Sequence, residues 1–170
     1  ENLLPLIKTT LKGDKLVVDL EGCVNSTEQI LIEVYSNSIS KISNDGSGNI
    51  YSIGTVKFES LAVNLDGSGS IELDLSGDEL ELELNGSGGI EVSGEATSGN
   101  FSLDGSGSIK AIDLAMNSGD VECNGSGSIS LYVKETLDVQ LNGSGDVKYK
   151  GNPQNIEQHN NGSGSIRRLD

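Results

Sequence analysis

The chain has 170 residues, which suffices for a single domain with a substantial buried core. Its formal net charge is −15, from 26 acidic and 11 basic residues, so its average field repels phosphates and anionic lipid headgroups and argues against nucleic acid as a partner. With 23 glycines, 2 prolines, 4% aromatic residues and no tryptophan, the composition suits neither a large aromatic ligand pocket nor an ordinary helical bundle.

The first 44 residues carry strand-like runs at 16–20 and 30–34 but no regular punctuation. No apolar run anywhere in the 170 residues approaches the ~20 residues that a bilayer-spanning helix needs, so we expect no membrane insertion by this chain. The opening residues lack the basic start and the apolar stretch of a signal peptide, so either the protein stays inside the cell or a leader has been removed. We expect residues 1–44 to form irregular coils of the same stack as the repeats that follow them.

A short motif recurs seven times from residue 45 onward. It consists of Asp or Asn, then Gly-Ser-Gly, one variable residue, and Ile or Val, and successive copies begin 18 to 21 residues apart. This spacing is too regular for chance and too short for helix-pair repeats or propeller blades, so it predicts the coils of a solenoid. The copies begin at Asp45, Asp66, Asn85, Asp104, Asn124, Asn142 and Asn161.

Each coil contains two segments in which apolar and polar residues alternate with period two, which is typical of half-buried strands. The clearest coil has these segments at 71–75 and 80–84, with a corner at 76–78 between them. Glycines on both sides of the turn serine permit positive φ, and the leading Asp or Asn can close the corner through its side chain. One coil therefore consists of a strand, a corner, a second strand and a Gly-Ser-Gly corner.

Aligning the coils on the motif predicts three aliphatic ladders in the core, because equivalent strands of successive coils pair in parallel about 4.8 Å apart. The ladder directly after the turn contains Ile50, Ile71, Ile90, Ile109, Ile129, Val147 and Ile166. The other two contain Leu65, Leu84, Leu103, Cys123 and Leu141, and Val63, Leu82, Phe101, Val121 and Val139. The predicted fold class is all-β, a single-stranded parallel β-helix (solenoid) with coils of about 19 residues.

The last coil departs from these ladders. Gln158 and Asn160 occupy the positions of Val and Leu in the other coils, and Arg167 and Arg168 follow Ile166. Such polar residues are expected where the end of a solenoid faces water and must not pair with another sheet edge.

No catalytic constellation stands out in the chain. The turn serines superficially resemble a nucleophile elbow, but that motif needs a further residue on each side of the serine and a strand-to-helix turn. His159 is the only histidine, and the alternation places it on the surface of the last coil, although any nucleophile with an imidazole base would have to use it. We predict no catalytic residue, no cofactor and no metal ligand set.

Acidic side chains occupy outward positions along the sheet faces. They are Glu72, Asp74, Glu81, Glu83, Glu91, Glu122 and Asp138. Such a row could bind a cation or a cationic surface, or serve an enzyme that cleaves polysaccharides, but alternating acids are more often a solvated face. The period also points Tyr149 inward and Tyr132 outward. A surface for sugar or protein would therefore combine Tyr132 with Glu72, Asp74, Glu81, Glu83 and Glu91.

The two cysteines are predicted to be free thiols. Cys123 occupies an interior ladder position, and Cys23 lies around five coils earlier, on the order of 24 Å away in a continuous stack. A disulfide needs Cα atoms within about 7 Å of each other.

Several landmarks together resemble one family across essentially the whole chain: the cadence of Gly-Ser-Gly-x-Ile turns, the opening Glu-Asn-Leu-Leu-Pro-Leu-Ile-Lys, and Tyr-Lys-Gly-Asn-Pro at 149–153. It is the putative auto-transporter adhesin, head GIN domain family, common in Bacteroidetes. The resemblance implies a right-handed β-helix in an exported protein of a Gram-negative cell envelope, often behind a signal or lipoprotein leader. Relatives usually carry one or two further strands before the opening residues, so the chain is expected to begin inside the domain. No catalytic residues are established for the family, so none is carried over.

We therefore predict one β-helix domain over residues 1–170, with irregular coils at 1–44 and seven Gly-Ser-Gly coils at 45–170. The leading hypothesis for its function is a non-enzymatic module in the periplasm, outer membrane or cell surface that presents a flat β-helix face to glycan or protein. A polysaccharide lyase or hydrolase on the same scaffold is the alternative, although short uniform turns build no walls for a cleft. A purely architectural spacer is the third hypothesis, and the oligomeric state stays open.

Overall fold

The computed structural model describes residues 6–21 and 30–170, and these residues form two compact units, divided between Tyr35 and Ser36. The first unit contains a β-hairpin of β1 (Ile7–Lys12) and β2 (Lys15–Leu20), which pair antiparallel. Gly13, with a φ of 62°, lies in the two-residue connection and lets the chain reverse there.

In the first unit an antiparallel hairpin stands where we expected part of the irregular coils of residues 1–44. The strand predicted at 16–20 is present, but a tight glycine turn returns it alongside its own neighbour in sequence. The strand predicted at 30–34 is absent, because these residues pair with no other segment among the described residues and several of their apolar side chains are exposed. That residues 1–170 together form one β-helix domain stays a prediction.

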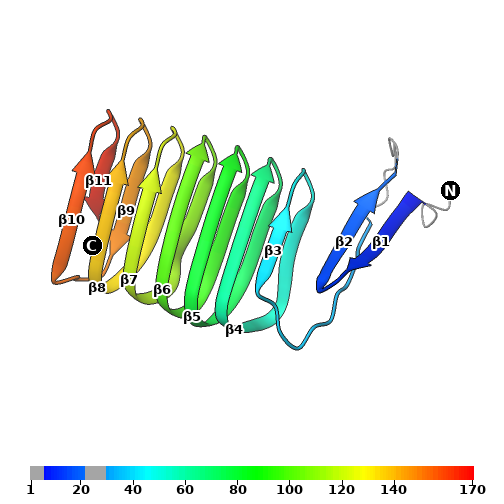
Figure 1. The fold of residues 1–170 in the computed structure, drawn as a ribbon. Helices are drawn as coiled ribbons and strands as arrows, with labels where there is room; N and C mark the ends of the chain where they lie inside the picture. Colours follow the sequence, from blue (N-terminus) through cyan, green and yellow to red (C-terminus); the bar gives the residue numbers. More distant parts are fainter. Residues whose placement is uncertain (1–5, 22–29) are drawn as a thin grey trace. The chain divides into compact units, whose positions relative to one another are not determined.

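The second unit is a parallel β-solenoid of about seven turns, which confirms the predicted fold class (Figure 1). Its longest strands run without interruption through the corner that lacks the Gly-Ser-Gly motif, so one strand forms most of one coil. The strands are β3 (Lys41–Asn44), β4 (Asn49–Gly67), β5 (Ser70–Gly86), β6 (Gly89–Gly105), β7 (Ser108–Cys123), β8 (Ser128–Leu141), β9 (Asp146–Lys150), β10 (Asn155–Asn160) and β11 (Ser165–Arg168).

Each coil contributes one segment to each of two sheet faces. We call the face built by the segments after the Gly-Ser-Gly turns the post-turn face, and the face built by the segments before them the pre-turn face. In β5, for example, Ile71 to Leu75 lie on the post-turn face and Leu80 to Leu84 on the pre-turn face. Alternate side chains point into the space between the faces, so both faces have polar outer surfaces.

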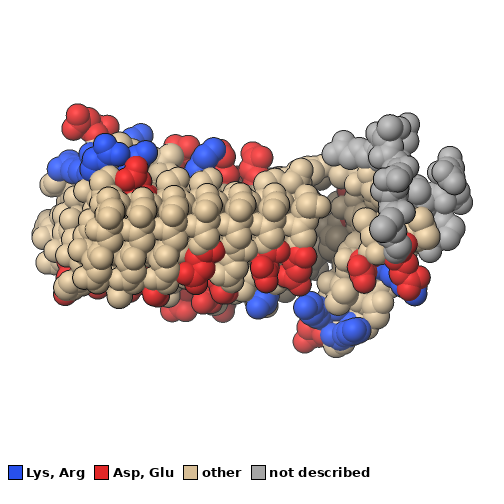
Figure 2. All heavy atoms as spheres, turned by 90° about the horizontal axis from the view of Figure 1, so that it is seen from above, with Lys and Arg blue, Asp and Glu red and all other residues tan. Residues whose placement is uncertain are grey.

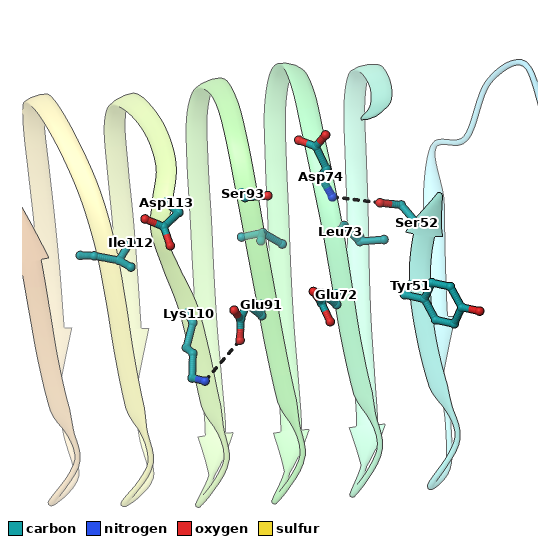
Figure 3. Close-up of a pocket in the computed structure, with 11 residues that line it drawn as sticks. Tyr51, Ser52, Glu72, Leu73, Asp74, Glu91, Ser93, Lys110, Ile112 and Asp113 are labelled. Carbon is teal, nitrogen blue, oxygen red and sulfur yellow. Dashed lines mark hydrogen bonds and ion pairs between the residues drawn. The ribbon is translucent and has the colours of Figure 1, made fainter. Parts of the chain in front are cut away.

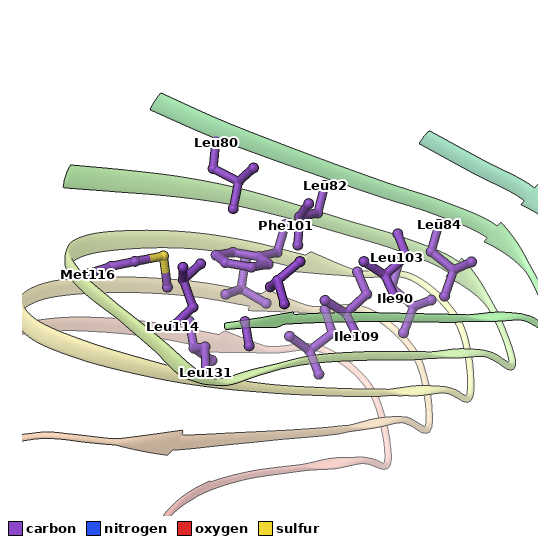
Figure 4. Packing of buried hydrophobic residues seen from close by; sticks show 14 of the residues in the cluster. Leu80, Leu82, Leu84, Ile90, Phe101, Leu103, Ile109, Leu114, Met116 and Leu131 are labelled. Atoms are coloured by element: carbon purple, nitrogen blue, oxygen red, sulfur yellow. The ribbon is translucent and has the colours of Figure 1, made fainter. Parts of the chain in front are cut away.

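The strand register confirms all three predicted ladders. Ile71 pairs with Ile90, Leu84 with Leu103, and so on along the stack. Their side chains form one continuous hydrophobic cluster between the two faces (Figure 4), and nearly all are less than 3% exposed. Ile50 and Ile166 are only partly buried, because they lie in the end coils. Burial of apolar surface stabilises the stack of coils, with a free energy of about 25 cal/mol for each Å² of apolar surface removed from water.

The Gly-Ser-Gly turns stack directly on one another. The amides of Ser87 and Gly88 both donate to the carbonyl oxygen of Gly67, at 3.0 and 3.1 Å. A Cβ atom on Gly88 would lie 2.4 Å from the Gly69 carbonyl oxygen. The first glycine of the turn has a positive φ in only three copies, at Gly67, Gly86 and Gly105. Glycine is therefore needed in the stacked turns mainly because successive backbones approach too closely for a Cβ atom. A positive φ is an additional reason in only those three copies.

Asparagines close the ladders at both ends of the solenoid. Asn44 in the first coil and Asn160 in the last occupy the position that Leu or Cys fills elsewhere. The Asn44 side-chain amide donates to the Gly48 carbonyl at 2.6 Å, and Asn160 donates to Gly164 at 3.0 Å. Gln158 and Asn160 are exposed on β10, as predicted for a coil that faces water.

Cys123 is a buried free thiol, as predicted, while Cys23 lies outside the described residues, so the state of that thiol stays a prediction. Burial raises the pKa of the Cys123 thiol. A backbone hydrogen bond from Gly125 lowers the pKa by less than burial raises it, and the charge of nearby Asp104 adds the smallest effect, an increase. In the part of the chain that the structure describes, no helix has the length and apolar character of a membrane span.

We predict that Gly88→Ala lowers the free energy of unfolding by about 1–3 kcal/mol, because the new methyl group meets the Gly69 carbonyl and the Leu65 side chain. Urea unfolding followed by circular dichroism measures the change. Gly48→Ala is the matched control, because no heavy atom lies within 4 Å of its added Cβ in the first turn, and it should change stability by less than about 0.5 kcal/mol. Equal effects at the two positions would contradict the steric explanation.

We also predict that Cys123 in the folded protein resists iodoacetamide at pH 8 and reacts at least about tenfold faster in denaturant, because the thiolate is the reactive form and both burial and the raised pKa suppress it. Peptide mass spectrometry separates Cys123 from Cys23. The residual native rate should rise with pH, and rapid labelling at neutral pH would show that the core opens at this coil.

Candidate functional site

A shallow hollow of about 360 Å³ opens on the post-turn face over β4 to β7 (Figure 3). Its lining combines one exposed tyrosine, several carboxylates and one lysine. Its polar side chains include Tyr51, Glu72, Asp74, Glu91, Lys110 and Asp113.

The outward ladder of these strands builds one wall of the hollow. Tyr51 pairs in register with Glu72, Glu72 with Glu91, and Glu91 with Lys110. The Lys110 Nζ atom lies 3.2 Å from a Glu91 carboxylate oxygen, and both side chains are about 60% exposed. This ion pair orients the carboxylate, although an exposed pair contributes only about 0–1 kcal/mol.

Hydrogen bonds between coils position the other wall. The Thr55 hydroxyl donates to the Asp74 carboxylate at 2.7 Å, and the Asp74 amide donates to the Ser52 hydroxyl at 3.0 Å. Asp74, Ser93 and Asp113 follow one another in the register, so they form a second polar row beside the first. The hollow is thus held by side chains from four successive coils.

Irregular pairing shapes the hollow. The register shifts between Tyr51 and Thr55, and again between Glu91 and Ser93, where the partner strand carries one extra residue, Ile112. These bulges turn apolar side chains outward, so that Ile53 is 78% exposed and Ile112 is half-buried in the hollow. Bulges often re-aim side chains near functional sites.

A second hollow, of about 320 Å³, lies on the pre-turn face. Its lining includes Glu81, Glu83, Asn100, Asp120 and Glu122. Partial burial raises the pKa of Asp120, and the charges of Asp138 and Glu122 raise it further. Like charges thus crowd one another on this face.

The two faces separate the predicted surface residues. Glu72, Asp74 and Glu91 come together in the post-turn hollow, whereas Glu81 and Glu83 lie in the pre-turn hollow. Tyr132 is half-buried further along the post-turn face, outside both hollows, so the six residues do not form one site.

Other side chains lie where the alternation places them. Tyr149 is 7% exposed and points into the core, as predicted. His159 is on the surface, 2.9 Å from Glu157. Among residues 6–21 and 30–170, no three His, Cys, Asp or Glu side chains form a group that could hold a metal ion.

Sequence reasoning missed Tyr51, Lys110 and Ile112 as members of a surface site. The available signal was the coil length. The copies that begin at Asp45 and Asp104 are followed by intervals of 21 and 20 residues in place of 19, and these longer coils contain the bulges beside the hollow.

The fold and its two polar faces define a parallel β-helix scaffold that presents flat sheets to solvent. The chain belongs to the family described as putative auto-transporter adhesin, head GIN domain, whose model matches residues 1–153. This match confirms the resemblance seen in the sequence. A comparison with curated proteins gives no match.

Solved structures share the fold. A structure described as a putative adhesin from Bacteroides fragilis NCTC 9343 has a TM-score of 0.93 and 24% identity, over 98% of this chain and 78% of that one. A putative lipid binding protein from Parabacteroides distasonis ATCC 8503 has a TM-score of 0.77 and 28% identity, over 99% and 80%. A putative adhesin from Parabacteroides merdae ATCC 43184 has a TM-score of 0.72 and 20% identity, over 100% and 80%.

The raised pKa of Asp120 predicts that its ionised carboxylate destabilises the folded protein, by an amount that depends on pH. Just above its ordinary pKa of 3.8, the folded protein binds more protons at this group than the unfolded chain does, so its contribution to stability falls as pH rises through that window. Asp120→Asn should increase the free energy of unfolding at pH 7, by less than about 1 kcal/mol because the carboxyl group is exposed.

The gain from Asp120→Asn should disappear at pH 3, where urea unfolding finds both variants neutral at this position. Asp66→Asn is the control, since it removes the same charge at a motif position where other copies already carry Asn. A larger gain from Asp66→Asn would argue against crowding on the pre-turn face.

Proposed function

We propose that this protein is an exported, non-enzymatic binding module of the adhesin type, and that its post-turn hollow contacts a glycan on a surface. The observation that carries the proposal is the exposed tyrosine placed beside a row of carboxylates on a flat sheet. Tyr51 is 52% exposed, and Glu72 and Glu91 follow it in the same outward ladder.

The chemistry of the hollow suits a sugar. A tyrosine ring offers an apolar surface and a hydroxyl group at a small cost in side-chain entropy. Carboxylates accept strong hydrogen bonds from hydroxyl groups, and the two rows of the hollow supply several of them on a rigid surface. Half-buried Ile112 adds apolar contact area to the lining of the hollow.

Membership of the adhesin-head family supports the adhesin-like role and an exported location. A polysaccharide lyase or hydrolase remains the alternative, because the hollow holds Lys110 among four carboxylates. One structural relative is described as a putative lipid binding protein, which raises lipid as a ligand. The packed ladders of the core and the acidic lining of both hollows favour a polar ligand instead.

Binding of the purified protein to an array of neutral glycans and extracellular-matrix proteins, with mass analysis of each glycan afterwards, tests the proposal. We expect saturable binding to a glycan without any change in its mass. Tyr51→Ala should weaken this binding at least about tenfold, as loss of a central aromatic contact does in many interfaces.

Tyr35→Ala is the matched control, because Tyr35 is an exposed tyrosine of the first unit and should leave binding unchanged. Shortened glycans would establish the enzymatic alternative. Binding to proteins alone would replace the glycan with a protein partner, and equal losses from both tyrosine variants would remove the hollow from the explanation.

A further inference from the structure

The charge of the solenoid is distributed unevenly along its axis. Residues 36–127 contain 15 acidic and 3 basic residues, whereas residues 128–170 contain 5 of each. Lys and Arg side chains accordingly gather at the end of the solenoid formed by the last coils (Figure 2). The last coils are thus the part of the solenoid that repels an anion least.

One outward ladder on the post-turn face shows the change of sign residue by residue. Its acidic part ends at the ion pair between Glu91 and Lys110, and no acidic residue follows in it. In coil order the ladder consists of Tyr51, Glu72, Glu91, Lys110, Ser130, Lys148 and Arg167.

Three cations lie close together where this ladder ends, and we call Lys148, Lys150 and Arg167 the basic patch. Lys148 and Arg167 are register partners on adjacent strands, about 4.8 Å apart, and Lys150 is two residues beyond Lys148 on the same side of β9. Arg167 has an ion pair with Asp146 at 3.4 Å. Among the described residues, no carboxylate forms an ion pair with either lysine.

The neighbouring Asp146 carboxylate is stabilised mainly by its own hydrogen bond. The hydrogen bond from Ser165 is the largest cause that lowers the pKa of Asp146, loss of hydration opposes it, and the charges of Arg167 and Lys148 lower the pKa further. These two cations thus contribute to stabilising an anionic group at this end of the face.

Tyr132 borders the basic patch. It is the register partner of Lys150, and its ring lies over Gly151, where an added Cβ atom would be 3.1 Å from the Tyr132 Cε2 atom. The ring is half-buried and so is held in place beside the lysine. An aromatic surface next to two lysines without ion pairs can contact a sugar ring and its anionic substituent together.

We propose that the basic patch, with Tyr132, is a second binding site on the post-turn face, and that it takes a short acidic oligosaccharide through its carboxylate or sulfate groups. The site is independent of the hollow at Tyr51. A long polyanion that ran along the whole face would meet Glu72 and Glu91, so the ligand crosses only the last coils.

An acidic sugar fits the patch better than an anionic membrane. A membrane surface would be engaged by exposed apolar side chains beside the cations. Within residues 128–170 the one large apolar side chain that is strongly exposed is Ile156, which lies on β10 and so on the pre-turn face.

Isothermal titration calorimetry with oligogalacturonate and with a heparin-derived hexasaccharide tests the proposal, with maltohexaose as the neutral probe. We expect both acidic probes to bind, with affinity that falls as sodium chloride rises from 0.05 to 0.5 M, roughly as expected from Debye screening. The double variant Lys148→Glu/Lys150→Glu should weaken binding at least about tenfold, and Tyr132→Ala should weaken it less.

The double variant Lys41→Glu/Lys57→Glu is the matched control, since it makes the same change in net charge in the first coils. It should leave the affinity within about twofold. Equal losses in the two double variants would overturn the site in favour of a general charge effect. The proposal also fails if neither acidic probe binds the folded protein, or if phosphatidylglycerol vesicles bind and the oligosaccharides do not.

Discussion

Each Gly-Ser-Gly turn rests directly on the carbonyl groups of the turn before it, at a distance that leaves no room for a Cβ atom. The Gly88 amide meets the Gly67 carbonyl at 3.1 Å, and the same contact recurs along the stack. This contact sets the spacing of the coils, and the spacing brings the aliphatic ladders into register. The core, the flat faces and the outward rows of side chains all depend on it.

A scaffold made in this way presents flat sheets with shallow hollows, not deep clefts. Because the turns of the solenoid are short and its coils nearly equal in length, no loop within residues 36–170 rises above the sheets to enclose a ligand. Functional variation must therefore come from side chains in outward ladders and from bulges such as those around Ile53 and Ile112. Both candidate sites follow this rule, one at the bulged early coils and one at the basic last coils.

The ends of the solenoid need a different solution from its middle. At Asn44 and Asn160 a side-chain amide bonds the turn carbonyl of its own coil, where inner coils bury Leu or Cys. Asn161, Asn142 and Asn124 are also linked by hydrogen bonds between their side chains, at 3.1 and 2.9 Å. Polar groups at the edge are thus bonded within the chain, which leaves fewer of them available to a neighbouring sheet edge.

The sequence alone determined the solenoid, its ladders and the inward or outward direction of residues such as Tyr149 and Glu72, because a motif repeated every 19 residues or so defines neighbours by simple addition. It assigned Glu72 and Glu81 to different segments of one coil, but it did not determine that the corner between these segments turns the two side chains onto opposite faces. The bulges that join Tyr51 to Lys110 in one hollow, and the antiparallel turn at Gly13, were likewise decided by tertiary structure. In each case the deciding factor was the path of the backbone and the choice of pairing partner. Period-two alternation predicts that a segment is a strand, but it is compatible with any partner strand.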